Sequence, residues 1–372
     1  MIVGEKESAQ VFEFKPCPER GVPEQVTGDH LWLNSGVMVQ GNNETTRLSF
    51  IESENLDPLY DGIGKIIGIP IERLVIDIAR RGTGSYVRNM TPPAVKDMIQ
   101  RRELGLDMIV DVLITTAQLC GYGKYESMGF RYEGDEDDYM TIRVTEPYSL
   151  PLTCGAHAGA CEAIVDNSEK VVYKEISPGV YEIKACVSEH PEELEDRLQV
   201  KPYHHRDGDI ELERCATCGG PAVLSGYRWH LDRGVIVNTW TNRRMVLVGP
   251  HVIDPVFEEL KKELGEAIPA AVVEAQRRFV KSGLYSIEEI GDEGDLRTQI
   301  AVRGMGNLRE IKIGAKGLSM RIDNAANHLM TVGLAQGLFE MAFDVESHVE
   351  WEVSAEGDLS VEITPKAVMM DA

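Results

Sequence analysis

The chain has 372 residues and a formal net charge of −23, from 38 basic and 61 acidic side chains. With 43% hydrophobic and 27% charged residues its composition is that of a globular protein, and its length predicts two or three domains. The negative charge excludes nucleic acid and anionic lipid surfaces as favoured partners. The first residues lack a basic region followed by an apolar run, and no apolar stretch is long enough for a bilayer. We therefore expect a cytoplasmic protein without membrane insertion, whose seven cysteines are thiols or metal ligands.

The predicted elements of the first half follow the order β-β-α-α-α-β-β-α-β-β, which is typical of an α+β fold. A small segment rich in Cys, Gly and Pro precedes them. Glycine or proline marks most of the boundaries, and Gly105 predicts a break within the third helix. The expected ranges are 31–40, 47–52, 57–67, 71–81, 94–118, 125–132, 139–145, 155–165, 171–175 and 180–187.

Short motifs of the first half recur in the second half in the same order. Cys17 recurs as Cys215, Asp57 with its proline as Asp254 with its proline, Gly121 as Gly304, and Gly155 as Gly333. The offset falls from 198 through 197 and 183 to 178, which places deletions in the second copy. We predict two diverged copies of one unit, each preceded by a small Cys-containing β segment.

The repeat predicts the domain boundaries. Residues 1–30 form the opening segment, 31–188 the first domain, 189–227 an acidic linker with a Cys-x-x-Cys knuckle, and 228–372 the second, shortened copy. The second copy closes with strands expected at 349–353 and 359–364.

Three motifs of the first copy carry a resemblance to a known family. They are Gly121-Tyr122-Gly123, the Gly-x-x-x-Gly of Gly155 and Gly159 entering a helix, and Glu175 followed by Cys186. From about residue 63 to 188 the chain resembles the 4-vinyl-reductase-like domain. That domain is the ligand-binding module of phenol- and xylene-sensing transcription activators and of a bacteriochlorophyll-biosynthesis protein. Its fold is shared with the haem nitric-oxide sensors and a vesicle-tethering subunit.

The resemblance implies a pocket between helices and sheet that binds a small hydrophobic, aromatic or tetrapyrrole-like molecule. It also implies that the two copies pack as an intramolecular pseudo-dimer. We expect the ligand to contact Tyr122, Arg143, Cys154, His157 and Cys161 in the first copy. The alternative for His157 is a helix-terminal histidine with a backbone partner.

Three arginine positions have structural alternatives to a binding role. Arg143 and its counterpart Arg321 are expected to form ion pairs with Glu162 and Glu340. The pair beginning at Arg80 is expected at the solvated end of an amphipathic helix, rather than in an anion site.

Two sets of residues predict metal binding. Cys215 and Cys218 have the spacing of half a tetrahedral zinc site, whose other half could come from His204, His205 or Cys17. The alternatives are a redox pair and a knuckle without metal. Domains of the 4-vinyl-reductase-like family often hold zinc through Cys, Glu, Cys and Cys. Glu175 and Cys186 match that pattern, whereas Leu150 and Pro178 stand where the other two cysteines would be.

The function predicted first is a binding protein that acts as a sensor, carrier or accessory factor, with zinc as the candidate metal. The alternatives are a metal- or cofactor-dependent enzyme or enzyme subunit that uses His157, Cys154 and Cys161, and a purely structural interaction protein. The sequence contains no nucleophile elbow, P-loop or dinucleotide motif. A homodimer is one of the assemblies left open.

Overall fold

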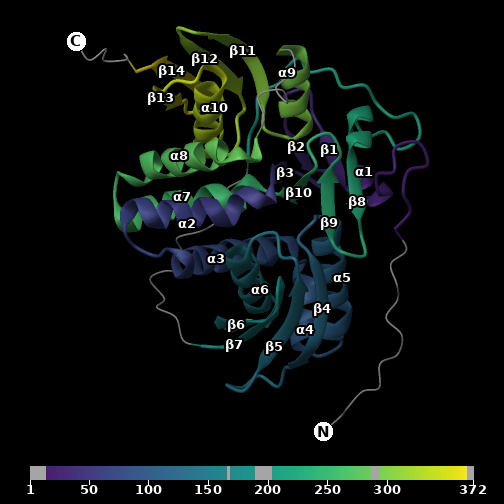
Figure 1. The fold of residues 1–372 in the computed structure, drawn as a ribbon. Helices are drawn as coiled ribbons and strands as arrows, with labels where there is room; N and C mark the ends of the chain where they lie inside the picture. The colour runs from purple at the N-terminus through teal and green to yellow at the C-terminus, as the bar shows by residue number, and fades with distance from the viewer. Residues whose placement is uncertain (1–13, 166–167, 189–202, 286–292, 367–372) are drawn as a thin grey trace.

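A computed structural model describes residues 14–165, 168–188, 203–285 and 293–366 of the chain. Helices alternate with antiparallel strands, and the strands form one sheet of six strands and two sheets of four. Figure 1 shows the two four-stranded sheets at opposite ends of the molecule, with helices between them. The expected α+β class is confirmed. The first part of the expected linker, residues 189–202, lies outside the described residues.

The six-stranded sheet has the mirrored strand order β1-β2-β3-β10-β9-β8. Its strands are β1 (His30–Trp32), β2 (Met38–Gln40), β3 (Asn43–Glu52), β8 (Tyr227–His230), β9 (Val235–Asn238) and β10 (Arg243–Val248). β3 and β10 pair antiparallel in the middle of this sheet. Because side chains alternate along a strand, the pair separates two cores: Phe50 and Leu247 face one, and Ile51 and Val246 face the other.

The central helices pack in pairs that join the two halves of the chain. The helices used below are α1 (Glu24–Asp29), α2 (Leu56–Ile67), α3 (Glu72–Met90), α4 (Pro93–Gln100), α5 (Leu106–Leu119), α6 (Leu150–Val165), α7 (Pro250–Leu264), α8 (Ile268–Phe279), α9 (Glu293–Val302) and α10 (His328–Phe343). α2 packs against α8, and α7 packs against α3. In the described part of the chain no helix has the length and apolar character needed to cross a membrane.

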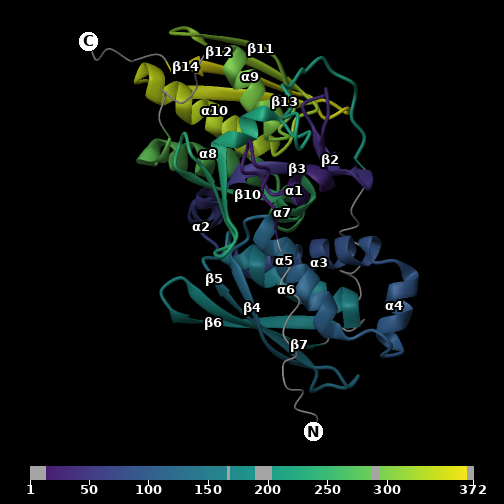
Figure 2. The ribbon, with the colours of Figure 1, turned by 90° about the vertical axis from the view of Figure 1, so that its right-hand side faces the viewer.

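The two four-stranded sheets have the same topology. One has the order β4-β5-β7-β6 and the other β11-β12-β14-β13. The strands are β4 (Lys124–Arg131), β5 (Tyr139–Thr145), β6 (Glu169–Ser177), β7 (Val180–Val187), β11 (Asn307–Gly314), β12 (Gly317–Asp323), β13 (Ser347–Val353) and β14 (Leu359–Pro365). α6 packs on the first sheet and α10 on the second. Figure 2 shows these two lobes below and above the central sheet.

The Gly-x-x-x-Gly motif allows two helices to cross closely. A Cβ at Gly155 would lie 2.4 Å from the carbonyl oxygen of Ile76 on α3, and a Cβ at Gly159 would lie 2.1 Å from that of Arg80. Gly333 on α10 stands in the same relation to α8, where a Cβ would lie 2.5 Å from a backbone oxygen. The motif is therefore a packing device, because only glycine permits this approach.

Each hairpin of the central sheet contacts the lobe formed by the other half of the chain. The indole N–H of Trp32 on β1 donates to the carbonyl of Val302 at 2.8 Å. The indole N–H of Trp229 on β8 donates to the carbonyl of Leu119 at 3.2 Å. The two bonds satisfy carbonyls at the ends of α9 and α5 that have no partner within their own helices.

Two arginines on the central strands also contact the lobe formed by the other half of the chain. Arg47 on β3 donates to the carbonyl of Gly304 at 2.8 Å. Arg244 on β10 donates to the carbonyls of Gly121 at 3.1 Å and Glu146 at 2.7 Å. Gly304 and Gly121 lie just before the first strand of each four-stranded sheet and Glu146 follows β5, so the guanidinium groups satisfy backbone oxygens at the edges of the lobes.

Three predicted elements differ from the structure. The helix expected at 71–81 is α3, which continues to Met90. The strand expected at 31–40 is the hairpin of β1 and β2, which turns where Gly36 adopts a φ of 73°. The helix expected at 155–165 begins earlier, at Leu150. Pro151 lies in its first turn, where the missing N–H costs no hydrogen bond, so this proline does not end the helix. The break expected at Gly105 is confirmed, since it separates α4 from α5.

We predict that Gly159→Ala lowers the free energy of unfolding by about 1–3 kcal/mol, because the added methyl group collides with the α3 backbone. Gly82→Ala on α3 is the control. A Cβ there would meet nothing within 4 Å, so we expect a change within about 1 kcal/mol, in the stabilising direction. Urea unfolding measures both, and an unchanged midpoint for Gly159→Ala would contradict the packing role.

Candidate functional site

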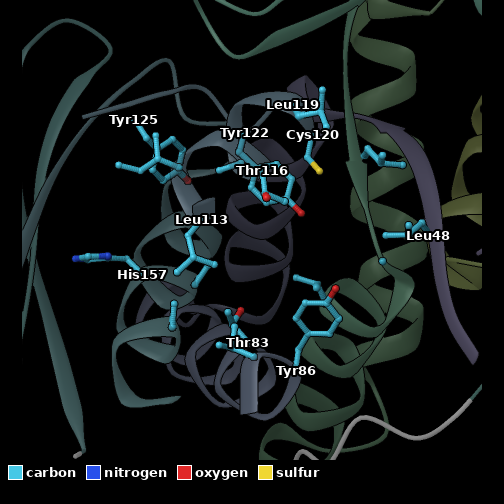
Figure 3. A pocket seen from close by; sticks show the side chains of 18 of the residues that line it. Leu48, Thr83, Tyr86, Leu113, Thr116, Leu119, Cys120, Tyr122, Tyr125 and His157 are labelled. Atoms are coloured by element: carbon cyan, nitrogen blue, oxygen red, sulfur yellow. The ribbon is translucent and has the colours of Figure 1, made fainter. Parts of the chain in front are cut away.

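A cavity of about 680 Å³ lies between the first lobe and the central sheet. Its wall comes from α3, α5, α6, the first two strands of the lobe sheet and residues of the central sheet such as Leu48 and Leu247. Figure 3 shows Leu113 and Thr116 of α5 facing Tyr86 of α3 across it. A cavity of this size fits a drug-sized molecule.

Stacked aromatic pairs form much of the polar part of the wall. The rings of Tyr122 and Tyr148 lie 4.5 Å apart between centroids. Tyr86 stacks on His251 at 5.2 Å, and its hydroxyl accepts a hydrogen bond of 2.6 Å from Gln40. Burial raises the pKa of Tyr122 and Tyr148 well above the ordinary value, so both stay neutral hydroxyls at pH 7.

The wall of the cavity carries almost no charge. Among the described residues that line it there is no lysine or arginine, and Asp29 is the single acidic residue. Burial lowers the pKa of the lining His157 and His251 to about 4 and also lowers that of His30. The three imidazoles are therefore neutral at pH 7.

His157 lies in the middle of α6 and not at the helix start where the sequence placed it. Its Nε2 is 3.1 Å from the carbonyl oxygen of Met140 on β5. Figure 3 shows the His157 ring pointing away from Leu113, towards the strands of the lobe sheet. The backbone partner expected in the alternative interpretation is present, and the residue also lines the cavity.

The other expected ligand contacts divide into two groups. Tyr122 and Cys161 line the cavity together with His157. Cys154 is fully buried in the apolar core between α6 and the sheet, and it does not line the cavity. Arg143 lies on β5 and pairs with a glutamate of β7 at 4.0 Å, outside the cavity wall. Cys154 and Cys161 lie two turns apart on the same side of α6, so their spacing could not show that only the later turn reaches the cavity.

The expected ion pair between Arg143 and Glu162 is wrong. Glu162 pairs instead with Arg80 of α3, which is buried and not at a solvated helix end. Arg277 of α8 pairs in the same way with Glu340 of α10. The close crossing of these helices brings the charges together, and each carboxylate also accepts a backbone N–H.

A group that could hold a metal ion is formed by Cys17, Cys215 and Cys218, whose sulfurs all lie within 4.8 Å of one another. Cys17 and Cys215 approach to 3.8 Å. The backbone N–H groups of Cys218 and Thr217 lower the pKa of the Cys215 thiol, and this favours a thiolate. His204 and His205, the other candidates, are not members of the group.

Glu175 and Cys186 do not meet in the structure. They lie on opposite strands of the β6–β7 hairpin, where Glu175 is opposite Tyr181 and Cys186 is opposite Lys170. The Glu175 carboxylate accepts the backbone N–H of Gly179 at 3.0 Å. Its role is to cap the hairpin turn, and the zinc pattern implied by the resemblance is not assembled there.

Comparisons with known proteins find few similarities. No family model matches the chain. No curated protein matches it either. Among solved structures, a Cs H-NOX mutant with 4-cyano-L-phenylalanine at site 5 is similar over 33% of this chain and 76% of its own, with 16% identity and a TM-score of 0.24. A mutant of T. Tengcongensis H-NOX is similar over 32% of this chain and 76% of its own, with 16% identity and a TM-score of 0.23.

We predict that His157 makes folding depend on pH. Its pKa falls from about 6.5 to about 4 on folding, so the neutral form is favoured. The stability that this provides is fully present above pH 6.5 and is lost as the pH falls towards 4. His157→Gln should therefore lose about 2–3 kcal/mol less free energy of unfolding between pH 7 and 4.5 than the wild type. His348→Gln, at an exposed position on β13, is the control that should behave as wild type. Denaturant unfolding across this pH range measures the difference, and equal slopes would contradict it.

Proposed function

We propose that the protein binds a small, uncharged hydrophobic or aromatic molecule in the cavity of the first lobe, as a sensor, carrier or accessory factor. The observation that carries this proposal is a volume of about 680 Å³ with an apolar and aromatic wall. An anion in this cavity would meet neither lysine nor arginine among the described residues of the wall, and they would not compensate its desolvation. An uncharged molecule avoids that cost.

We infer that the chain consists of two copies of one unit, with lobes related to the 4-vinyl-reductase-like domain at about 31–188 and 228–372. The mirrored order of the central sheet and the common topology of the two lobe sheets support this. The matched pairs Trp32 and Trp229 support it too, since each donates to the lobe of the other copy. In this arrangement the copies exchange their hairpins.

An enzymatic role is less well supported by the same residues. Burial raises the pKa of the Cys154 and Cys161 thiols, which disfavours the reactive thiolate. His157 uses Nε2 for the carbonyl of Met140 and stays neutral far below pH 7. Buried, weakly acidic thiols and a neutral imidazole suit a binding surface better than an acid–base site.

We also propose that the three-cysteine group holds zinc. Thiolates are the ligands that zinc prefers in structural sites, and three of them converge here from two turns that are far apart in sequence. A bound ion would join residue 17 to the segment around 215.

For the cavity, we predict that Leu113→Trp weakens binding of the neutral dye Nile red at least about tenfold, because the indole fills space that the ligand needs. Val112→Trp is the matched control, since Val112 is the neighbouring residue of α5, is 46% exposed and does not line the cavity. Fluorescence titration measures both. Wild-type protein that does not bind the dye, or a Leu113→Trp variant that binds like wild type, would contradict the proposal.

For the metal, elemental analysis of purified protein should find about one zinc ion per chain. Cys17→Ser should lose it, whereas Cys186→Ser on β7 should retain it. Loss of zinc from neither variant would exclude this site.

A further inference from the structure

The two turns that carry the cysteines have the same backbone structure. In the first turn the N–H of Gly21 donates to the carbonyl of Cys17 at 2.7 Å, and in the second the N–H of Gly219 donates to that of Cys215 at 2.9 Å. Each turn is a knuckle whose first position holds a cysteine. The fourth position of the second knuckle is Cys218, and in the first it is Arg20. Two such knuckles would supply four ligands, but this pair supplies three thiols.

The Arg20 side chain does not take part in the cluster. Its guanidinium lies 3.8 Å from the carboxylate of Glu213, and an arginine cannot ligate a metal because it remains protonated. A tetrahedral ion held by Cys17, Cys215 and Cys218 therefore needs a fourth ligand from another residue.

The neighbouring residue, Glu19, meets that need. Its Oε2 lies 3.3 Å from the Sγ of Cys215, and its Oε1 accepts a hydrogen bond from the hydroxyl of Thr217. One carboxylate oxygen thus faces the Cys215 thiol, and the other is held by Thr217. This is the usual arrangement of a ligating carboxylate that donates one oxygen and is oriented through the other.

Two distances around Cys215 are close to those of a tetrahedral zinc centre. Zn–S bonds of about 2.3 Å at the tetrahedral angle place two sulfurs about 3.8 Å apart, and a Zn–O bond of about 2.1 Å places oxygen and sulfur about 3.6 Å apart. The sulfurs of Cys17 and Cys215 lie at 3.8 Å, and the Glu19 oxygen lies 3.3 Å from Cys215. The Glu19 carboxylate does not lie within 4.8 Å of all three sulfurs, so this exposed side chain must turn further towards Cys17 and Cys218 to complete the tetrahedron.

We propose that Glu19 is the fourth ligand, so that the protein has a Cys₃Glu zinc site in place of a site with four cysteines. This rests on the proposal that the three cysteines hold zinc. The site lies between the segments that lead into β1 and β8, the two edge strands of the six-stranded sheet. Arg214, next to Cys215, already bridges these segments by donating to the carbonyl of Trp32 at 2.6 Å. The ion would fix the two edges to each other.

The test uses the full-length protein loaded with zinc or with Co²⁺. Glu19→Ala should weaken zinc binding at least about tenfold in competition with a chelator, since the ion loses a ligand. Glu19→Cys should restore tight binding and increase the thiolate-to-Co²⁺ charge-transfer absorption by about a third, from three thiolates to four. Glu24→Ala, which removes an exposed acidic side chain near the site, should match the wild type.

The outcomes separate the two proposals. If the wild type binds zinc through the cysteines but Glu19→Ala binds it as tightly, Glu19 is not a ligand and the three-cysteine site stands. If Glu19→Cys shows no gain in charge-transfer absorption although it binds Co²⁺, the position of Glu19 in the coordination sphere is also refuted. If the wild type binds no zinc, both proposals fail. Circular dichroism of each variant establishes that the fold is retained.

Discussion

The pairing of β3 with β10 is the constraint on which the rest of the structure depends. It joins strands about 200 residues apart, and the Ser49 hydroxyl adds a bond of 3.0 Å to the carbonyl of Val248 across it. Once these strands are paired, each hairpin points towards the lobe made by the other half of the chain. The contacts of Trp32 and Trp229 follow from this placement. Pairing strands so far apart in sequence costs conformational entropy, because a long loop must be closed. Burial of the two apolar cores on the faces of the pair offsets this cost.

Much of the fold could be predicted from local sequence. The period of the apolar residues and the glycine and proline breaks gave most of the elements, because these signals act within a few residues. Partners across the chain could not be predicted in this way. Arg80 was expected in solvent and Arg143 beside Glu162, but the crossing of α3 and α6 at Gly159 places Arg80 against Glu162. Small residues such as Gly155 and Gly159 indicate that a helix has a close neighbour, but they do not show which helix that neighbour is.

In the candidate sites, too, local motifs could be predicted from the sequence and long-range partners could not. Cys215 and Cys218 are recognisable by their spacing, and Cys17 could be named as one of several candidates because it repeats Cys215. Glu19 could not be found, since a single exposed glutamate carries no signal until the two knuckles meet. On α6, Cys161 lines the cavity, whereas Cys154, two turns earlier on the same side of the helix, lies in the core. Which turn of α6 reaches the cavity depends on where α5 covers the lobe.

The position of the cavity follows from how α5 is held, and the side chains of its wall limit the charge of a ligand. The carbonyl of Cys120, at the end of α5, accepts a bond of 2.9 Å from Leu247 of β10, so this helix is held over the space between lobe and sheet. The protein has a net charge of −23, and the described part of the cavity wall offers no positive charge against it. Among the described residues of the wall, Asp29 is the one acidic residue and there is no lysine or arginine. An anionic ligand would be repelled by the whole protein at long range and would lack a counter-ion inside. This argues against a tetrapyrrole that brings carboxylate groups into the cavity, and it favours the uncharged aromatic molecules among the ligands that the sequence suggested.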